Sequence, residues 1–155
     1  MRTAFMIMLV SAVGSAACGR DTSMSDLQMK AVATGSRLSV TWTNTGQAPL
    51  RVATHVFAGE KHFDWLTVTL TSDSAGPRTL VFRADRDESG AVFVDLAPGA
   101  EAAETIDLAA WALRKVNREQ ALAPGHFQGR VVYDTGTETR GWQGRLEAPF
   151  VIDVP

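Results

Sequence analysis

The stretch Lys61-His62-Phe63-Asp64 contains residue types that could do chemistry in this chain of 155 residues. His62 and Asp64 are two positions apart, so on a β-strand both side chains would lie on one face. An imidazole and a carboxylate are ligands that zinc accepts, and they are also groups that hydrolases use for proton transfer. No third ligand can be identified in the sequence. Because Trp65 follows directly, we treat His62, Asp64 and Trp65 as a candidate binding site.

A second candidate lies in the acidic stretch that starts at Asp85. Asp85, Asp87 and Ser89, followed by Gly90, match the opening of a calcium-binding loop, in which alternating oxygen ligands converge on a hard cation. The glutamate that closes such a loop is missing, because Leu96 occupies its position. Asp, Ser and Gly also favour a polar hairpin turn. Calcium is therefore the one cofactor that the sequence suggests, and a plain turn is the alternative.

Other catalytic and binding classes find little support. The sequence has no G-x-S-x-G nucleophile motif and no phosphate-binding loop. The formal net charge is −2, and no stripe of basic residues is present, so we expect no nucleic-acid partner. The sequence thus predicts a protein that is not an enzyme, with a hydrolase built on His62 and Asp64 as an alternative.

The single cysteine, Cys18, follows a segment typical of a signal peptide. Arg2 supplies a positive charge, and residues 4–13 form an uncharged apolar run that is too short to span a bilayer as a helix. Ser15-Ala16-Ala17-Cys18 resembles the lipobox of bacterial lipoproteins, with Ser15 in place of the favoured leucine. An ordinary secretory cleavage after Ala17 is the alternative.

The lipobox resemblance implies that Cys18 becomes the acylated N-terminus of the mature protein. Two or three acyl chains would hold the protein firmly on a membrane, because one chain alone binds only marginally. Gly19 directly after the cysteine favours sorting to the outer membrane in Gram-negative relatives. We therefore expect a signal peptide at residues 1–17, a lipidated cysteine with a tether at 18–26, and a folded domain at 27–155, exported to the bacterial envelope.

The folded domain shows the alternation of apolar and polar residues that is typical of half-buried strands. Leu38, Val40 and Trp42 alternate with Ser39, Thr41 and Thr43, and residues 65–72 repeat the pattern. Residues 79–83 and 91–96 are expected to pair with each other. Two L-A-P-G segments, at residues 96–99 and 122–125, predict type II turns. The alternation and turn spacing predict an all-β, antiparallel sandwich of seven to nine strands.

One segment departs from the strand pattern and predicts a short helix near residues 108–118. Leu108, Trp111 and Ala112 have helical spacing, and Asp107 is a candidate N-cap. We expect this helix to cross one end of the sandwich.

These features resemble the Ig-like β-sandwich domains of bacterial envelope lipoproteins. The resemblance is carried by TWTNTGQAPLRV (residues 41–52), by the L-x-P-G turns, by PGHF leading to VVY, and by WQGRLEAPFVIDV (residues 142–154). It implies a non-catalytic module that binds an envelope protein or has a structural role. The Asn-turn-Pro segment and the PG-x-aromatic strand start are also similar to BsuPI-type proteinase-inhibitor domains, which implies protease inhibition as the alternative function.

Overall fold

Alternating apolar and polar residues form antiparallel strands along most of the chain that the structure describes. The computed structural model describes residues 25–84, 90–136 and 140–155. The strands are β1 (Leu27–Thr34), β2 (Arg37–Asn44), β3 (Leu50–Phe57), β4 (Lys61–His62), β5 (Leu66–Ser72), β6 (Ala75–Val81), β7 (Ala91–Leu96), β8 (Glu101–Asp107), β9 (Gly125–Asp134) and β10 (Arg145–Val154). The expected all-β sandwich is confirmed, with ten strands among these residues rather than seven to nine.

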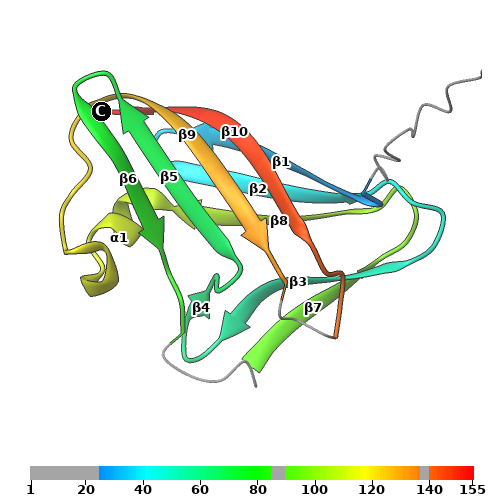
Figure 1. The fold of residues 1–155 in the computed structure, drawn as a ribbon. Helices are drawn as coiled ribbons and strands as arrows, with labels where there is room; N and C mark the ends of the chain where they lie inside the picture. Colours follow the sequence, from blue (N-terminus) through cyan, green and yellow to red (C-terminus); the bar gives the residue numbers. More distant parts are fainter. Residues whose placement is uncertain (1–24, 85–89, 137–139) are drawn as a thin grey trace, which may run out of the picture.

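The strands form three sheets, with the orders β1-β2-β8, β10-β9-β5-β6 and β4-β3-β7. The first two sheets lie one behind the other as the layers of the sandwich, and the third lies at one end (Figure 1). Strand β1 lies beside β10, so the two layers meet along these strands. This arrangement leaves one face of the four-stranded sheet pointing away from the core.

Two buried aromatic residues from opposite layers meet in the core. The Trp42 ring on β2 contacts the Tyr133 ring on β9 edge to face, at 5.3 Å between centroids. The Tyr133 hydroxyl donates a hydrogen bond of 2.7 Å to the carbonyl of Ala53 on β3. The Trp142 ring also stacks on the Tyr133 ring, at 5.9 Å between centroids. Tyr133 therefore links all three sheets, and Trp42 is buried, on the apolar side of the alternation seen in the sequence.

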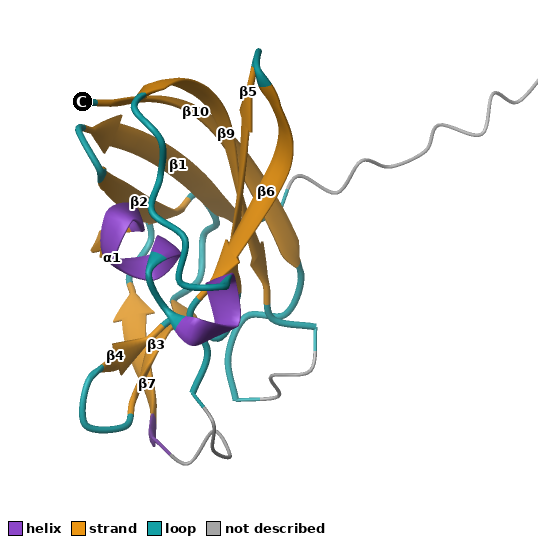
Figure 2. Cartoon of the chain, turned by 90° about the vertical axis from the view of Figure 1, so that its left-hand side faces the viewer, coloured by secondary structure: helices purple, strands orange, loops and turns teal. Residues whose placement is uncertain are grey.

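The short helix predicted near residues 108–118 is present as two pieces, α1 (Leu108–Ala112) and the 3-10 helix η2 (Lys115–Asn117). Asp107 is the N-cap of α1, and its side chain accepts hydrogen bonds from the backbone N–H groups of Ala109 and Ala110. Trp111 is buried and packs 5.9 Å from Phe82, centroid to centroid. Both helical pieces lie on one side of the molecule, next to β6 (Figure 2).

The outer edge of β6 is covered by side chains rather than by another strand. Asn117 is buried, and its side-chain amide donates to the Val81 carbonyl at 2.8 Å and accepts from the Val81 N–H at 3.0 Å. The same amide donates to the Trp111 carbonyl at 2.7 Å. Arg78 donates to four backbone carbonyls of the adjoining segment, those of Ala112, Asn117, Gln120 and Ala121. The two bonds to Val81 satisfy backbone groups that an edge strand otherwise leaves open, and the Arg78 bonds hold the adjoining segment against β6.

The predicted pairing of residues 79–83 with residues 91–96 is wrong. β6 forms a hairpin with β5, and β7 pairs instead with β3. Gly76 and Pro77 are both unfavourable within a strand, yet β6 already begins at Ala75. Proline is tolerated there because β6 is an edge strand, where a missing N–H breaks no ladder.

The two L-A-P-G segments adopt different conformations. Gly99 has φ 77°, and the Ala100 N–H donates to the Ala97 carbonyl at 2.9 Å, as the predicted type II turn requires. Gly125 has φ 144° and already belongs to β9, so the second segment leads directly into a strand.

Candidate functional site

The binding site expected at His62, Asp64 and Trp65 stays a prediction, but the expectation that His62 and Asp64 share one strand face is wrong. β4 ends at His62 and Asp64 lies in a turn, so the two side chains do not share a strand face. The Asp64 carboxylate accepts a hydrogen bond of 2.8 Å from the Ala84 N–H. The His62 ring packs against the Phe82 ring at 4.6 Å, and Trp65 is only 5% exposed. These contacts give His62, Asp64 and Trp65 roles in packing and in loop structure.

The metal-binding hypotheses gain no further support from the described residues. In residues 25–84, 90–136 and 140–155, no group of three or more His, Cys, Asp or Glu side chains lies close enough to hold a metal ion. Asp85, Asp87 and Ser89 of the calcium-loop hypothesis lie outside the described residues, as does Cys18. Both hypotheses therefore stay predictions. Over the same ranges, no helix is long and apolar enough to cross a bilayer.

The two remaining histidines both contact a carboxylate. His55 is buried, and its Nδ1 lies 2.9 Å from a Glu104 oxygen; Lys61 Nζ lies 2.9 Å from the other oxygen of the same carboxylate. This cluster connects β3 and β4 to β8. His126 pairs with Asp153 across β9 and β10 on the surface, at 2.7 Å. Both arrangements join strands.

The most distinctive surface is the outer face of the four-stranded sheet, meaning the side chains of β10, β9, β5 and β6 that point away from the core. Val68 and Leu70 of β5 are buried below it, whereas Thr67, Thr69 and Thr71 point outward. The face is hollowed, with an open cavity of about 1000 Å³ lined by residues from all four strands. The hollow is wide enough to receive part of another molecule.

Strand register orders the outer face into rows. Thr69 on β5 pairs with Thr79 on β6 and with Arg130 on β9, which in turn pairs with Pro149 on β10. Arg130 therefore stands in the middle of the face, next to threonine hydroxyls. The following rows contain Thr67, Val132 and Glu147, and then Asp134 and Arg145.

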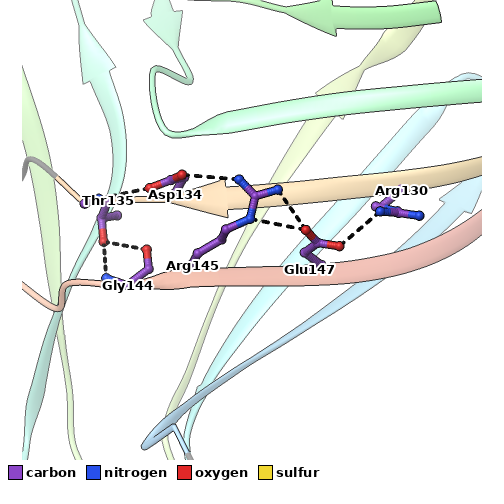
Figure 3. A network of polar contacts seen from close by, with 7 residues as sticks. Arg130, Asp134, Thr135, Gly144, Arg145 and Glu147 are labelled. Atoms are coloured by element: carbon purple, nitrogen blue, oxygen red, sulfur yellow. Dashed lines mark hydrogen bonds and ion pairs between the residues drawn. The ribbon is translucent and has the colours of Figure 1, made fainter. Parts of the chain in front are cut away.

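The charged residues of β9 and β10 form a chain of ion pairs along one side of the outer face (Figure 3). Arg145 donates to Glu147 through Nη2 at 2.8 Å and through Nε at 3.2 Å, and its Nη1 lies 3.4 Å from Asp134. The other oxygen of Glu147 accepts from Arg130 Nη1 at 3.3 Å. Glu147 thus connects the two arginines.

The ion pairs shift the pKa values of Glu147 and Arg145. The hydrogen bond from Arg145 lowers the pKa of Glu147 below its usual value, and the positive charge of Arg130 adds to the effect. The hydrogen bond to Glu147 raises the pKa of Arg145. All these groups are exposed, so solvent weakens the attraction. Near neutral pH the network therefore holds ionised side chains in fixed positions without burying them.

A threonine at the end of β9 fixes the start of β10, where Arg145 begins the strand. Thr135 is buried, and its hydroxyl donates to the Trp142 carbonyl at 2.8 Å and accepts from the Gly144 N–H at 3.2 Å. The Thr135 N–H donates to the Gly144 carbonyl at 3.0 Å (Figure 3). These bonds hold the two strand ends together, so Asp134 and Arg145 meet across the sheet.

Sequence reasoning placed the threonines of β5 on a solvated face but did not identify Arg83, Arg130, Arg145 or Glu147. The available signal was the parity of β9, where Gln128, Arg130 and Val132 alternate with buried residues. Parity alone could not show that β9 pairs with β5 and β10, and this pairing brings the polar residues together. The outer face is a polar surface on an ordered sheet, and its arginine and threonine side chains can donate hydrogen bonds to a ligand.

Comparison with known proteins does not extend this description. No protein-family model matches the chain. A search of curated proteins finds no relative with significant sequence similarity.

Proposed function

We propose that this protein is a lipid-anchored interaction module of the bacterial envelope, and that it binds a partner protein through the outer face of its four-stranded sheet. The observation that carries the proposal is the open hollow on this face, lined by side chains from all four strands. Because the side chains stand on a hydrogen-bonded antiparallel sheet, their positions are set before a partner arrives, which lowers the entropy cost of binding.

A binding role fits the chemistry of the outer face better than a catalytic role. The carboxylates of Glu147 and Asp134 accept hydrogen bonds from Arg145, and the bond to Glu147 favours the ionised form of that carboxyl group. Efficient general acid–base catalysis near neutral pH favours a carboxyl group whose pKa is raised, whereas that of Glu147 is lowered. The face therefore supports recognition of a partner.

Membrane attachment rests on the N-terminal sequence, because Cys18 follows a segment typical of lipoprotein signal peptides. Replacing Cys18 with serine should block lipidation and processing and release the protein from the membrane fraction. Fractionation of cells followed by mass spectrometry of the N-terminus measures both effects. Retention of the Cys18→Ser variant on the membrane, with the same processing as the unchanged protein, would contradict the anchor.

Site-specific photo-crosslinking in intact envelopes tests the binding face. A crosslinking amino acid at position 69 lies at the centre of the outer face, on an interior strand of its sheet. Thr41 is a matched control, because it is a half-buried threonine on the middle strand of the other sandwich layer. We expect a discrete adduct with one protein from position 69 and none from position 41. Adducts of equal yield from both positions, or from position 41 alone, would refute this choice of face.

The identity of the crosslinked protein distinguishes a general interaction module from a proteinase inhibitor. If the partner is a protease and the purified chain inhibits it, the proteinase-inhibitor alternative replaces the general interaction module.

A further inference from the structure

We infer that the partner presents an acidic, extended segment to the outer face, and that Arg83 and Arg130 bind its carboxylates. This inference rests on the proposed function and names the chemistry of the partner at the same site. The supporting observation is a difference in hydrogen bonding. The carboxylates of the outer face already have partners within the chain, whereas the guanidinium groups of Arg83 and Arg130 have N–H donors without a partner in the part of the chain that the structure describes.

The guanidinium groups at the hollow have donors to spare. A guanidinium carries five N–H donors. Arg130 has a 65% exposed side chain, and the one bond that the structure gives it is the 3.3 Å contact with Glu147. Arg83 lines the hollow and is exposed, and it forms no hydrogen bond or ion pair with the described residues. Arg83 can therefore bind a carboxylate, and Arg130 can bind a second one without losing its contact with Glu147.

The carboxylates near the hollow are already bound within the chain. Both oxygens of Glu147 accept from arginine, and the Asp134 oxygens accept from Arg145 and from the Gly136 N–H. Asp64 accepts from the Ala84 N–H. A basic partner would have to compete for these acids. An acidic partner instead meets open donors, and carboxylate–guanidinium bonds are among the stronger hydrogen bonds in proteins.

The dimensions of the face suit a peptide in an extended conformation. Four strands spaced about 4.8 Å apart make a face about 14 Å wide, which an extended chain crosses in about four residues. Thr69 and Thr79 stand beside Arg130 in the same row, and their hydroxyls can donate to or accept from the backbone of such a segment. The guanidinium groups would bind the acidic side chains of the segment, and the threonine hydroxyls would form hydrogen bonds with its backbone.

Two capped peptides of equal length test the inference with the full chain in detergent. One alternates threonine with glutamate and the other alternates threonine with glutamine. We expect the glutamate peptide to bind at least about tenfold more tightly and to lose affinity as salt is added, because salt screens exposed charges. It should also shift the NMR signals of the Nε–H groups of Arg83 and Arg130.

Substitutions of arginine test whether Arg83 and Arg130 bind the glutamate peptide. Arg83→Gln combined with Arg130→Gln should lower the affinity for the glutamate peptide at least about tenfold, whereas Arg37→Gln should leave it unchanged. Arg37 is a suitable control because it is exposed and lies on β2, in the other layer. Circular dichroism checks that each variant folds.

Three results would overturn the acidic-segment inference: equal affinity for the two peptides, equal losses in both variants, or no binding of either peptide. Tighter binding of inorganic phosphate than of the glutamate peptide would also overturn it and would indicate a phosphate ligand. In each case an adduct from position 69 would keep the outer face as the binding site, so failure of the inference is distinguishable from failure of the proposed function.

Discussion

Replacing Asn117 with aspartate tests how the edge of β6 is held, since the substitution keeps the shape of the side chain and removes its two N–H donors. Asn117 is 6% exposed and donates bonds of 2.8 and 2.7 Å to the carbonyls of Val81 and Trp111. Each lost bond costs about 1 kcal/mol, and the loss of the side-chain donor at the Val81 carbonyl adds to this, whereas the Trp111 carbonyl keeps its bond from the Arg114 N–H. At neutral pH the new carboxylate would also face both carbonyls.

These terms together predict that Asn117→Asp lowers the free energy of unfolding by about 3 kcal/mol at neutral pH. For a domain of this size the loss corresponds to a fall in Tm of about 10 °C. Burial raises the pKa of such a carboxyl group, and the protonated form can donate one hydrogen bond. The loss should therefore shrink as the pH falls through the raised pKa, because the repulsive charge disappears.

Urea unfolding monitored by tryptophan fluorescence, at about pH 7 and about pH 4.5, measures both effects. Gln47→Glu is the control for the added charge, because Gln47 is exposed in a turn; it should change stability by less than about 0.5 kcal/mol. A loss below about 0.5 kcal/mol for Asn117→Asp, or a loss that does not depend on pH, would refute the account of the β6 edge.

Three further substitutions and one titration probe the core and the outer face. Tyr133→Phe should cost about 1–2 kcal/mol in urea unfolding, because a buried carbonyl on β3 loses its donor; an unchanged midpoint would contradict this. Gly129→Ala should cost about 1–3 kcal/mol, since a Cβ there would lie 2.3 Å from the Phe150 ring; a stable variant with unchanged Tm would show that the ring can move. The Glu147 carboxyl should titrate by NMR below the range usual for a glutamate, and its contribution to stability should be present above the pKa of the unfolded chain and lost as the pH falls through the lowered pKa. Arg145→Gln should raise that pKa, and no change would argue against the ion pair in solution.

Local features of the fold were readable from the sequence because each depends on neighbouring residues. The alternation around Trp42 depends on the two-residue period of a strand, and the cap at Asp107 depends on a side chain that reaches the next turn. The partners of β6 and β7 were not readable, because pairing depends on contacts between segments far apart in the sequence. Pro77 added to the error, since its cost in a strand depends on whether the strand lies at an edge.

The outer face shows the same division between local and distant information. Thr69 could be assigned to a solvated face from its own strand, but its position beside Arg130 follows from the pairing of β5 with β9. His62 and Asp64 attracted attention as chemically versatile residue types, and the structure uses them beside Phe82 and the Ala84 N–H. Residue types indicated which side chains could take part in chemistry. Only the strand pairing shows that arginine N–H groups without partners among the described residues lie together on the outer face.

Tyr133 lies close to two indole rings, so its fluorescence reports whether the two layers of the sandwich are together. It is the single tyrosine of a chain with four tryptophans. With ring centroids 5.3 and 5.9 Å away, light energy absorbed by the phenol passes to tryptophan while the layers are together. Tyrosine emission should therefore be nearly silent in the native protein and emerge when the layers separate, without any attached dye.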